Sequence, residues 1–165
     1  MNRRHFFFGL GGLLVAPTVY LRVSATEEGS NMKTPYEVVR SDEEWRRLLT
    51  DMEFYVLREE GTERPWTSAL NNEKRPGIYV CAGCEQPLFS SEQKFDSGTG
   101  WPSFFDTLEG AIGTKKDFKL LVPRTEYHCS RCGGHHGHVF KDGPAPTGLR
   151  YCNNGIALKF IPERT

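Results

Sequence analysis

Two matched cysteine pairs constrain the fold of this 165-residue chain more than any other feature. Each pair is a Cys-x-x-Cys unit that follows a tyrosine by two residues: the first holds Cys81 and Cys84, the second Cys129 and Cys132. Four thiolates fill the tetrahedral shell of a zinc ion and leave no open position, as in structural rather than catalytic sites. A shared zinc ion would join two distant turns, so the pattern predicts a fold that is closed by metal.

Residues 1–25 have the composition of an export signal. Arg3 and Arg4 precede an uncharged stretch that is short and only mildly hydrophobic for a membrane span, and small residues suited to cleavage follow it. The paired arginines favour the twin-arginine route, and an ordinary secretory signal or an uncleaved anchor is the alternative. We therefore expect a signal peptide at 1–25, a linker at 26–33, a folded domain at 34–165 and a periplasmic location.

The charge of the chain argues against nucleic acid as a partner. There are 21 basic and 21 acidic residues, and residues 1–25 hold three arginines and no acidic residue, so the remainder has a net charge of −3. No basic stretch is long enough to follow a phosphate backbone. The remaining length suits one domain of ordinary size, which we expect to be a monomer.

If the protein is exported, the cysteine pairs have more than one interpretation. An oxidising compartment would allow two disulfides, and a single pair could also serve a thiol–disulfide oxidoreductase. Adjacent Cys-x-x-Cys disulfides are strained, however, and a redox protein needs only one pair. A twin-arginine exporter carries folded proteins, so zinc could be loaded before export. Zinc is therefore the favoured interpretation.

Helix signals come early in the chain and strand signals come later. Ser41 and Thr50 each begin a capping box that is followed by apolar residues at helical spacing, which predicts two short helices, the second ending near Gly61. The segments with strand character are 77–80, 118–122, 124–127, 149–153 and 156–161. This order predicts a small α+β domain that is dominated by antiparallel sheet.

The fifth cysteine, Cys152, stands apart from the pairs. Arg150 and Asn154 lie two residues to either side of it, and hence on the same face of a strand. An arginine at that position favours the thiolate, and the asparagine offers an amide donor. The alternative is a buried structural thiol, which is what lone cysteines most often are. The row of polar residues favours a pocket in which Cys152 is the reactive group.

Histidines and a tryptophan add to this candidate pocket. His135, His136 and His138 supply groups that titrate near neutral pH. A second metal site is the alternative, although no carboxylate follows these histidines until Asp142. Trp101 comes after a glycine-rich turn, where its ring would either pack in the core or form the wall of an apolar slot.

Four ordered motifs and the two cysteine pairs make the chain resemble the type B methionine sulfoxide reductases. The motifs are Gly-Thr-Glu-Arg-Pro at 61–65, Phe-Asp-Ser-Gly-Thr-Gly-Trp-Pro-Ser-Phe at 95–104, His-His-Gly-His-Val-Phe at 135–140 and Gly-Leu-Arg-Tyr-Cys-Asn-Asn at 148–154. Each motif alone is modest, but the ordered set is specific. The resemblance covers about residues 34–161.

The resemblance implies a mainly β (α+β) fold, in which two antiparallel sheets form a rolled sandwich or barrel-like domain after short N-terminal helices. It implies a structural zinc on the four paired cysteines and no organic cofactor. It also implies that methionine R-sulfoxide, free or in oxidised proteins, is reduced to methionine while Cys152 becomes a sulfenic acid. The non-enzymatic alternative is a zinc-stapled β-domain that binds peptides and merely buries Cys152.

The resemblance also gives roles to individual residues by their position. Cys152 would be the nucleophile that attacks the sulfoxide sulfur, and a donor must protonate the oxygen that leaves. The other implied residues divide into those that assist catalysis, namely Arg150, His135, His138 and Asn154, and those that bind the substrate, namely Trp101 and Phe104.

Two positions depart from the commonest pattern of that family. Thr99 stands where many members have a second cysteine that resolves the catalytic one. Because every other cysteine is assigned to zinc, an outside thiol, from a thioredoxin-like protein or a small molecule, would have to reduce the sulfenic acid at Cys152. His136 stands where a leucine is usual, and the sequence offers no account of it.

Overall fold

The two helices begin where their capping boxes predict. In the computed structural model, which describes residues 36–164, α1 spans Asp42–Leu48 and α2 spans Asp51–Glu59. The Ser41 hydroxyl accepts a hydrogen bond from the Glu44 amide, and the Glu44 carboxylate accepts one from the Ser41 amide at 2.7 Å. Thr50 forms the same reciprocal pair with its third helical residue. Each box satisfies amides that a helix start would leave without partners.

Nine strands follow, together with three short 3-10 turns, in the described part of the chain. The strands are β1 (Gly77–Cys81), β2 (Pro87–Ser90), β3 (Lys94–Phe95), β4 (Ser103–Phe104), β5 (Ile112–Asp117), β6 (Arg124–Cys129), β7 (His135–Phe140), β8 (Arg150–Asn153) and β9 (Leu158–Pro162). The 3-10 turns are η1 (Ala69–Asn72), η2 (Ser91–Gln93) and η3 (Gly155–Ala157).

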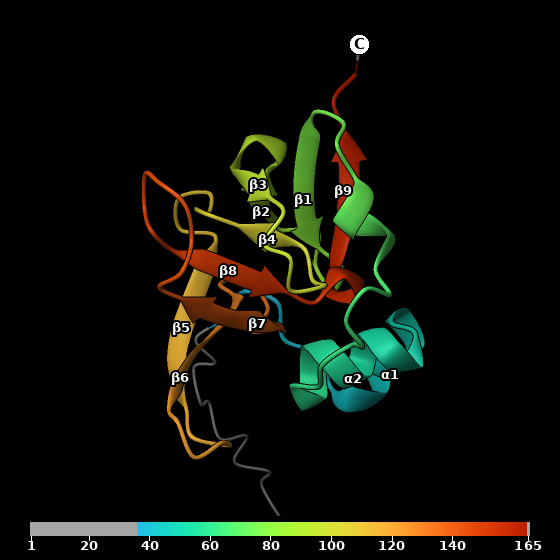
Figure 1. Cartoon of the computed structure of the whole chain (residues 1–165). Coiled ribbons are helices and arrows are strands. Elements are labelled where there is room, and N and C mark those ends of the chain that lie inside the picture. Colours follow the sequence, from blue (N-terminus) through green and yellow to red (C-terminus); the bar gives the residue numbers. More distant parts are fainter. Residues whose placement is uncertain (1–35, 165) are drawn as a thin grey trace, which may run out of the picture. The chain divides into compact units, whose positions relative to one another are not determined.

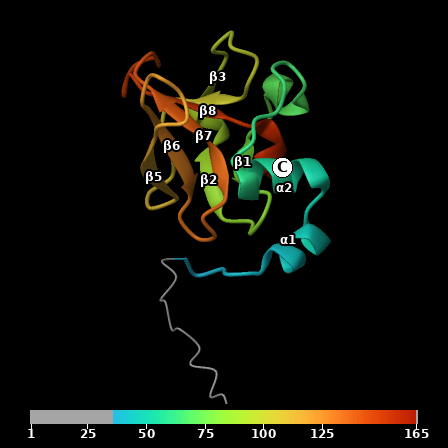
Figure 2. The ribbon, with the colours of Figure 1, turned by 90° about the horizontal axis from the view of Figure 1, so that it is seen from below.

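The strands form two antiparallel sheets. The smaller sheet has the order β2-β1-β9, and the larger has the order β3-β4-β8-β7-β6-β5. Figure 1 shows β7 and β8 of the larger sheet running across the direction of β1 and β9. Both helices lie on one side of the strands (Figure 2), and α2 packs against β7 and η3. The expected fold class, mainly β with two antiparallel sheets and short N-terminal helices, is confirmed.

Aromatic side chains from both sheets pack together in the core. Phe89 of β2 stacks on Phe104 of β4 with ring centroids 4.1 Å apart, and Tyr79 of β1 meets Phe104 edge-on at 5.0 Å. All three side chains are fully buried, and such pairs stabilise a core beyond the area that they bury. The Phe104 ring faces the opposite sheet and does not line the pocket beside Cys152, so its expected role in binding the substrate stays a prediction.

One predicted strand is absent and another begins later than predicted. Residues 118–122 form the turn between β5 and β6, because the Asp117 carboxylate accepts the Lys119 amide at 2.9 Å and bends the chain there. Ile156 lies in η3, and the last strand begins only at Leu158. The strands predicted at 77–80, 124–127 and 149–153 are confirmed within a residue or two of their ends.

The expected signal peptide at 1–25 and linker at 26–33 lie outside the described residues. The expected boundaries of the folded domain, 34–165, stay a prediction. Between residues 36 and 164, none of the helices has the length and apolar character needed to cross a membrane.

Candidate active site

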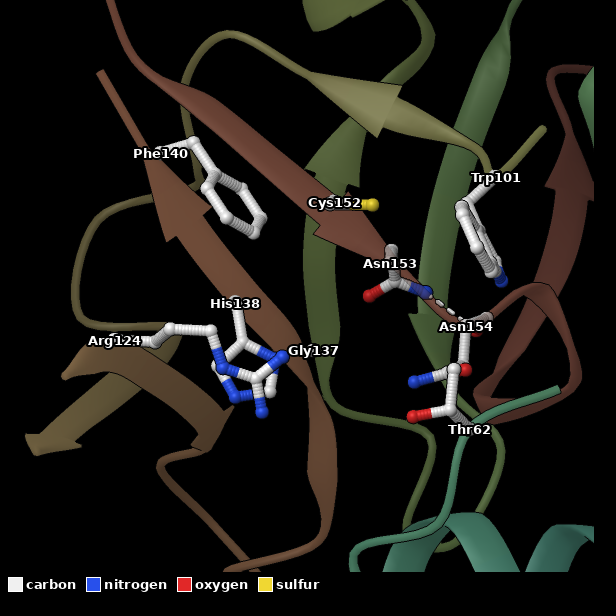
Figure 3. Close-up of a pocket in the computed structure, with 9 residues that line it drawn as sticks. All are labelled: Thr62, Trp101, Arg124, Gly137, His138, Phe140, Cys152, Asn153 and Asn154. Atoms are coloured by element: carbon white, nitrogen blue, oxygen red, sulfur yellow. Dashed lines mark hydrogen bonds between the residues drawn. The ribbon is translucent and has the colours of Figure 1, made fainter. Parts of the chain in front are cut away.

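A pocket of about 130 Å³ opens beside Cys152. Figure 3 shows the sulfur of Cys152 pointing toward the indole of Trp101, with His138 and Phe140 on the neighbouring strand β7. The pocket is lined by Thr62, Trp101, Arg124, Gly137, His138, Phe140, Cys152, Asn153 and Asn154. Its size suits the end of one side chain, so the rest of a larger molecule would lie outside it.

Strand register brings the polar side chains of the pocket together. Cys152 of β8 is directly opposite His138 of β7 on one side and Ser103 of β4 on the other. Directly opposed residues of antiparallel strands place their side chains on the same face, with Cβ atoms about 5 Å apart. Gly137 permits this close pairing, because a Cβ atom there would lie 1.9 Å from the carbonyl oxygen of Cys152.

Burial controls the charge of the Cys152 thiol. It raises the pKa of the thiol above its ordinary value, while the charge of Arg150 and a hydrogen bond from Thr99 lower the pKa by smaller amounts. The Arg150 guanidinium is itself held by two hydrogen bonds to Asp142, at 2.9 and 2.8 Å, and lies 4.4 Å from the centre of the Phe140 ring. Arg150 therefore acts in the expected direction, but the free thiol remains protonated at neutral pH.

His138 is held at the pocket by a carboxylate. Its Nε2 lies 2.6 Å from Asp117, and the same carboxylate accepts a hydrogen bond from Arg124 at 2.7 Å. The Lys119 amide, His138 and Arg124 together hold the pKa of Asp117 well below its usual range. Burial lowers the pKa of His138, and the hydrogen bond to Asp117 opposes this effect. His138 therefore lies in the pocket as predicted, whereas sequence reasoning missed Arg124 and Asp117.

His135 lies behind the pocket and does not line it. Its ring is buried, and its Nδ1 is 2.8 Å from the carboxylate of Glu126, which His128 also contacts at 3.2 Å. Burial alone would raise the pKa of Glu126, but these two hydrogen bonds outweigh it and lower the pKa to about 2. His135 packs against His138 with ring centroids 5.6 Å apart, and its expected contact with the substrate oxygen stays a prediction.

Asn154 and Glu63 fix the wall that carries Trp101. The Asn154 side chain accepts the Glu63 amide at 3.0 Å and donates to the His136 carbonyl at 2.9 Å, so each end of its amide has a partner within the protein. The Trp101 indole donates to the Glu63 carbonyl at 3.1 Å. The Glu63 carboxylate accepts the Ile156 amide at 3.2 Å, and burial raises its pKa. Trp101 and Asn154 thus lie at the pocket as predicted, and Asn154 positions its wall.

Several lining residues could not be found from the sequence. Thr62 reaches the pocket from the segment after α2, and Phe140 reaches it from the end of β7. Thr62 belongs to the motif at 61–65 and Phe140 to the motif at 135–140, but the sequence of a motif does not show which of its side chains face the pocket. Arg124 carried no signal beyond its place at the start of a strand.

The four paired cysteines form a second, separate cluster. Their sulfur atoms all lie within 4.8 Å of one another, with 3.8 Å between Cys81 and Cys132 and 3.5 Å between Cys84 and Cys129. Sulfurs bound to one tetrahedral zinc at 2.3 Å lie about 3.8 Å apart, so the donor set and its spacing fit this metal. All five cysteines of the chain are free of disulfides. The cluster can therefore hold a metal such as zinc.

A single thiol in a small pocket, set apart from a closed four-cysteine cluster, is the arrangement of a thiol-dependent oxidoreductase. The family model described as "SelR domain" matches residues 49–162. The chain therefore belongs to the SelR domain family, the type B peptide methionine sulfoxide reductases.

Its relatives support the same family over most of their length. A protein of Methanosarcina barkeri named "Peptide methionine sulfoxide reductase MsrB" is 52% identical over 127 residues, which is 76% of this chain and 89% of that protein. One of the same name from Leifsonia xyli is 52% identical over 133 residues, or 79% of this chain and 96% of that protein. "Peptide methionine sulfoxide reductase B1, chloroplastic" of Oryza sativa is 49% identical over 77% of this chain and 60% of its own length. The predicted resemblance is confirmed.

Among solved structures, the Mis18 "Yippee-like" domain aligns with 55% of this chain and 100% of its own, at 19% identity and a TM-score of 0.43. This similarity is too low to support an argument about fold or function.

Proposed function

We propose that this protein reduces methionine R-sulfoxide, free or within proteins, to methionine, with Cys152 as the nucleophile. The observation that carries the proposal is the position of the Cys152 sulfur between Trp101 and His138 in a pocket that admits one side-chain end. The relatives named as peptide methionine sulfoxide reductases support the same substrate class. A module that only binds peptides would not need a thiol in that position.

The chemical step transfers one oxygen atom and two electrons. The Cys152 sulfur attacks the sulfoxide sulfur and forms a transient S–S bond. The oxygen, once protonated, then passes to the Cys152 sulfur as the substrate S–O bond and this S–S bond break, which leaves Cys152 as a sulfenic acid and releases methionine. The substrate sulfur is reduced and the cysteine sulfur is oxidised, which is the first rung of cysteine oxidation. The substrate oxygen must gain a proton before it can leave, so a donor is needed at the start.

The raised pKa of Cys152 provides that proton within the pocket. Because burial keeps the free thiol protonated, the S–H proton moves to the sulfoxide oxygen as the thiolate forms. His138 lies directly opposite Cys152 and relays this proton, held in position by Asp117. Arg150 then stabilises the thiolate that the transfer leaves behind.

The two sides of the pocket support a preference for one epimer. Trp101 and Phe140 form apolar walls for the methyl group, whereas His138 and Arg124 offer donors for the oxygen. A sulfoxide sulfur is chiral. If the rest of the substrate side chain enters the pocket from a fixed direction, only one epimer places its methyl group against the apolar walls and its oxygen against the donors. The family resemblance supplies the hand, which is R, and separate enzymes serve the two epimers.

An outside thiol completes the cycle. One external thiol attacks the Cys152 sulfenic acid and releases water, and a second thiol breaks the resulting mixed disulfide, so two thiols become one disulfide. The other four cysteines belong to the metal cluster, and Thr99 occupies the position of a resolving cysteine. A thioredoxin-like protein or a small thiol is the reductant in this proposal. Zinc on the four-cysteine cluster has a structural role, and the enzyme works as a periplasmic monomer exported by the twin-arginine route.

The central test compares the two epimers. Methionine R- and S-sulfoxides are supplied separately with dithiothreitol to the native enzyme and to Cys152→Ser, which keeps the shape of the pocket. R-selective turnover that Cys152→Ser loses supports the proposal. Equal activity in the variant, or a preference for the S epimer, would refute it. Metal content and circular dichroism show that the variant is folded.

A second test follows the oxidised cysteine. After one turnover without reductant, dimedone should label Cys152, and intact mass should show one label per chain. Recovery of Cys152 in an internal disulfide, with no label, would contradict the one-cysteine cycle but leave sulfoxide reduction itself intact.

A further inference from the structure

Apolar side chains stand exposed in the turn between β5 and β6. We call this turn, residues 118–123, the β5–β6 loop. Its large hydrophobic side chains have exposed fractions of 71% for Phe118, 58% for Leu120, 103% for Leu121 and 73% for Val122. Exposed apolar residues that occur singly are normal in soluble proteins, but a contiguous group marks a surface of interaction.

The loop is fixed on the molecule by its charged neighbour. The Lys119 amide donates to Asp117 at 2.9 Å, and the Lys119 ammonium lies 2.6 Å from Glu60 at the end of α2. Lys115 of β5 contacts the same Glu60 carboxylate at 2.5 Å. The one charged residue among 118–122 is therefore turned toward the body of the protein, and the apolar residues on either side of it face outward.

The β5–β6 loop is continuous with the rim of the Cys152 pocket. Asp117 precedes the loop and holds His138, and Arg124 follows the loop and lines the pocket. From Cys152 across β7 to Glu126 of β6 is two strand spacings, or about 10 Å, and the loop lies three residues from Glu126, about 10 Å further along β6. An extended polypeptide covers that distance in about four residues. When a side chain of a polypeptide substrate enters the pocket, the residues about four positions away in that polypeptide therefore lie at the loop.

We propose that the β5–β6 loop binds apolar residues of an unfolded polypeptide that flank the methionine sulfoxide, and so makes such segments the preferred substrate. This inference rests on the proposed function. Because the pocket of about 130 Å³ holds only the end of one side chain, the rest of a polypeptide substrate lies on the surface around it. Oxidation of a buried methionine disrupts the core around it, so the damaged segment exposes apolar residues next to the sulfoxide.

Two substrates and two matched variants test the proposal. The peptides carry methionine R-sulfoxide in the middle and differ only in having leucine or serine three and four positions to either side. The loop variant is Leu120→Ser with Leu121→Ser. The control is Leu48→Ser with Ile161→Ser, which removes two comparably exposed apolar side chains, 60% and 53%, outside the pocket and the loop. Dithiothreitol is the reductant in every assay.

For the native enzyme and the control variant, kcat/KM should be about tenfold higher for the leucine peptide than for the serine peptide, mainly through KM. The loop variant should lose that difference and retain native turnover of free methionine R-sulfoxide. Equal kcat/KM for the two peptides in the native enzyme, or an unchanged difference in the loop variant, would overturn the inference. If the native enzyme turned over no sulfoxide at all, the proposed function would fail first.

Two further measurements distinguish other occupants of the loop. With free methionine R-sulfoxide as substrate, the KM for a thioredoxin-class protein should be the same in the native enzyme and the loop variant. An increase confined to that KM would assign the loop to the reductant and overturn the inference. Sedimentation should give the same mass for both proteins, and a native dimer that the loop variant dissociates would assign the loop to a second copy of the chain.

Discussion

The reactivity of the Cys152 thiol depends on the few groups that touch its sulfur. Burial raises the pKa of Cys152, and the opposing contributions come from Arg150 and Thr99. Thr99 belongs to a row of hydroxyls, since its Oγ1 lies 2.8 Å from Ser97, which in turn lies 2.8 Å from Ser103. Thr99 therefore lies where its hydroxyl can lower the pKa of the thiol.

Removal of the Thr99 hydroxyl should make Cys152 less reactive. In Thr99→Val the thiolate loses a hydrogen bond worth about 1 kcal/mol, so the pKa rises further and the thiolate fraction at neutral pH falls about fivefold. The rate of alkylation by iodoacetamide at pH 7, read at Cys152 by mass spectrometry, should fall by that factor. Thr99→Ser keeps the hydroxyl and should react like the native protein. Equal rates for all three would show that this hydrogen bond has no effect on the thiol.

His136 is a buried histidine whose ring nitrogens lack hydrogen-bond partners in the described residues. Its ring is fully buried, stacks on Tyr127, and has no hydrogen-bond partner for either nitrogen among the described residues. The amide of Asn153 beside it already donates to Asn154 and accepts from Tyr127. Burial lowers the pKa of His136 to about 3, so the ring is neutral in the folded protein.

His136→Leu should therefore stabilise the protein. Replacing two unpaired ring nitrogens by a side chain of similar size should raise the free energy of unfolding by about 1–2 kcal/mol at pH 7, measured by urea denaturation. The advantage should grow as the pH falls from 6.5, because the unfolded native chain then binds a proton that the folded state excludes until about pH 3. The growth should be about 1.4 kcal/mol per pH unit. A less stable variant would mean that the ring has a partner.

The residues of the pocket could be predicted where a short sequence motif identifies them, and not where their position depends on the register between strands. Cys152, Trp101 and His138 could be named because a lone thiol, a tryptophan after a glycine turn and a histidine cluster are visible in the sequence. Arg124 reaches the pocket because β6 pairs with β7, a contact that no short motif records. That Phe104 and His135 do not line the pocket could not be predicted for the same reason, since which face of a strand a residue occupies depends on its neighbouring strands.

At the scale of the elements, helices could be predicted from local sequence, whereas strands depend also on their neighbours in the sheet. The starts of α1 and α2 agree with the prediction, because a capping box satisfies backbone groups within four residues. The segment 118–122 has β-favouring residues, yet it forms a turn because Asp117 binds the Lys119 amide and the chain must reverse into β6. Strand propensity describes suitability for a half-buried surface, and this segment has no such surface.

The centre of the larger sheet depends on one buried carboxylate. Glu126 of β6 is 3% exposed and contacts His135 at 2.8 Å and His128 at 3.2 Å. Its pKa of about 2, against an ordinary 4.5, corresponds to about 3 kcal/mol of stability. Because the folded pKa is the lower one, this stability is present above pH 4.5 and is lost as the pH falls toward 2.

Glu126→Gln should lose most of that stability at pH 7. The expected decrease in the free energy of unfolding is about 2–3 kcal/mol, and the difference from the native protein should shrink between pH 4.5 and 2. Thermal unfolding across that range measures both effects. A matched control is Glu92→Gln, an exposed acid in η2, which should change neither. A constant difference at all pH values would show that the ionisation of Glu126 does not contribute.

At the scale of the whole molecule, the four-cysteine cluster joins elements that no local signal connects. Cys81 and Cys84 lie at the turn between β1 and β2 in the smaller sheet, and Cys129 and Cys132 lie at the turn between β6 and β7 in the larger sheet. A metal at this point ties the two sheets together at a distance from the Cys152 pocket. Metal binding then becomes part of the folding free energy, of order 10 kcal/mol for structural zinc.

That contribution is comparable with the whole stability of a small domain, about 5–15 kcal/mol, so removal of the metal should unfold the protein. Native mass spectrometry should find one zinc per chain, and a strong chelator should remove it with cooperative loss of the circular dichroism signal. Cys152→Ser should retain one zinc, whereas Cys84→Ser should not, which would separate the four sulfurs of the cluster from that of Cys152. A zinc-free mass lower by four hydrogens would mean two disulfides instead, and stability would then respond to reductant and not to chelator.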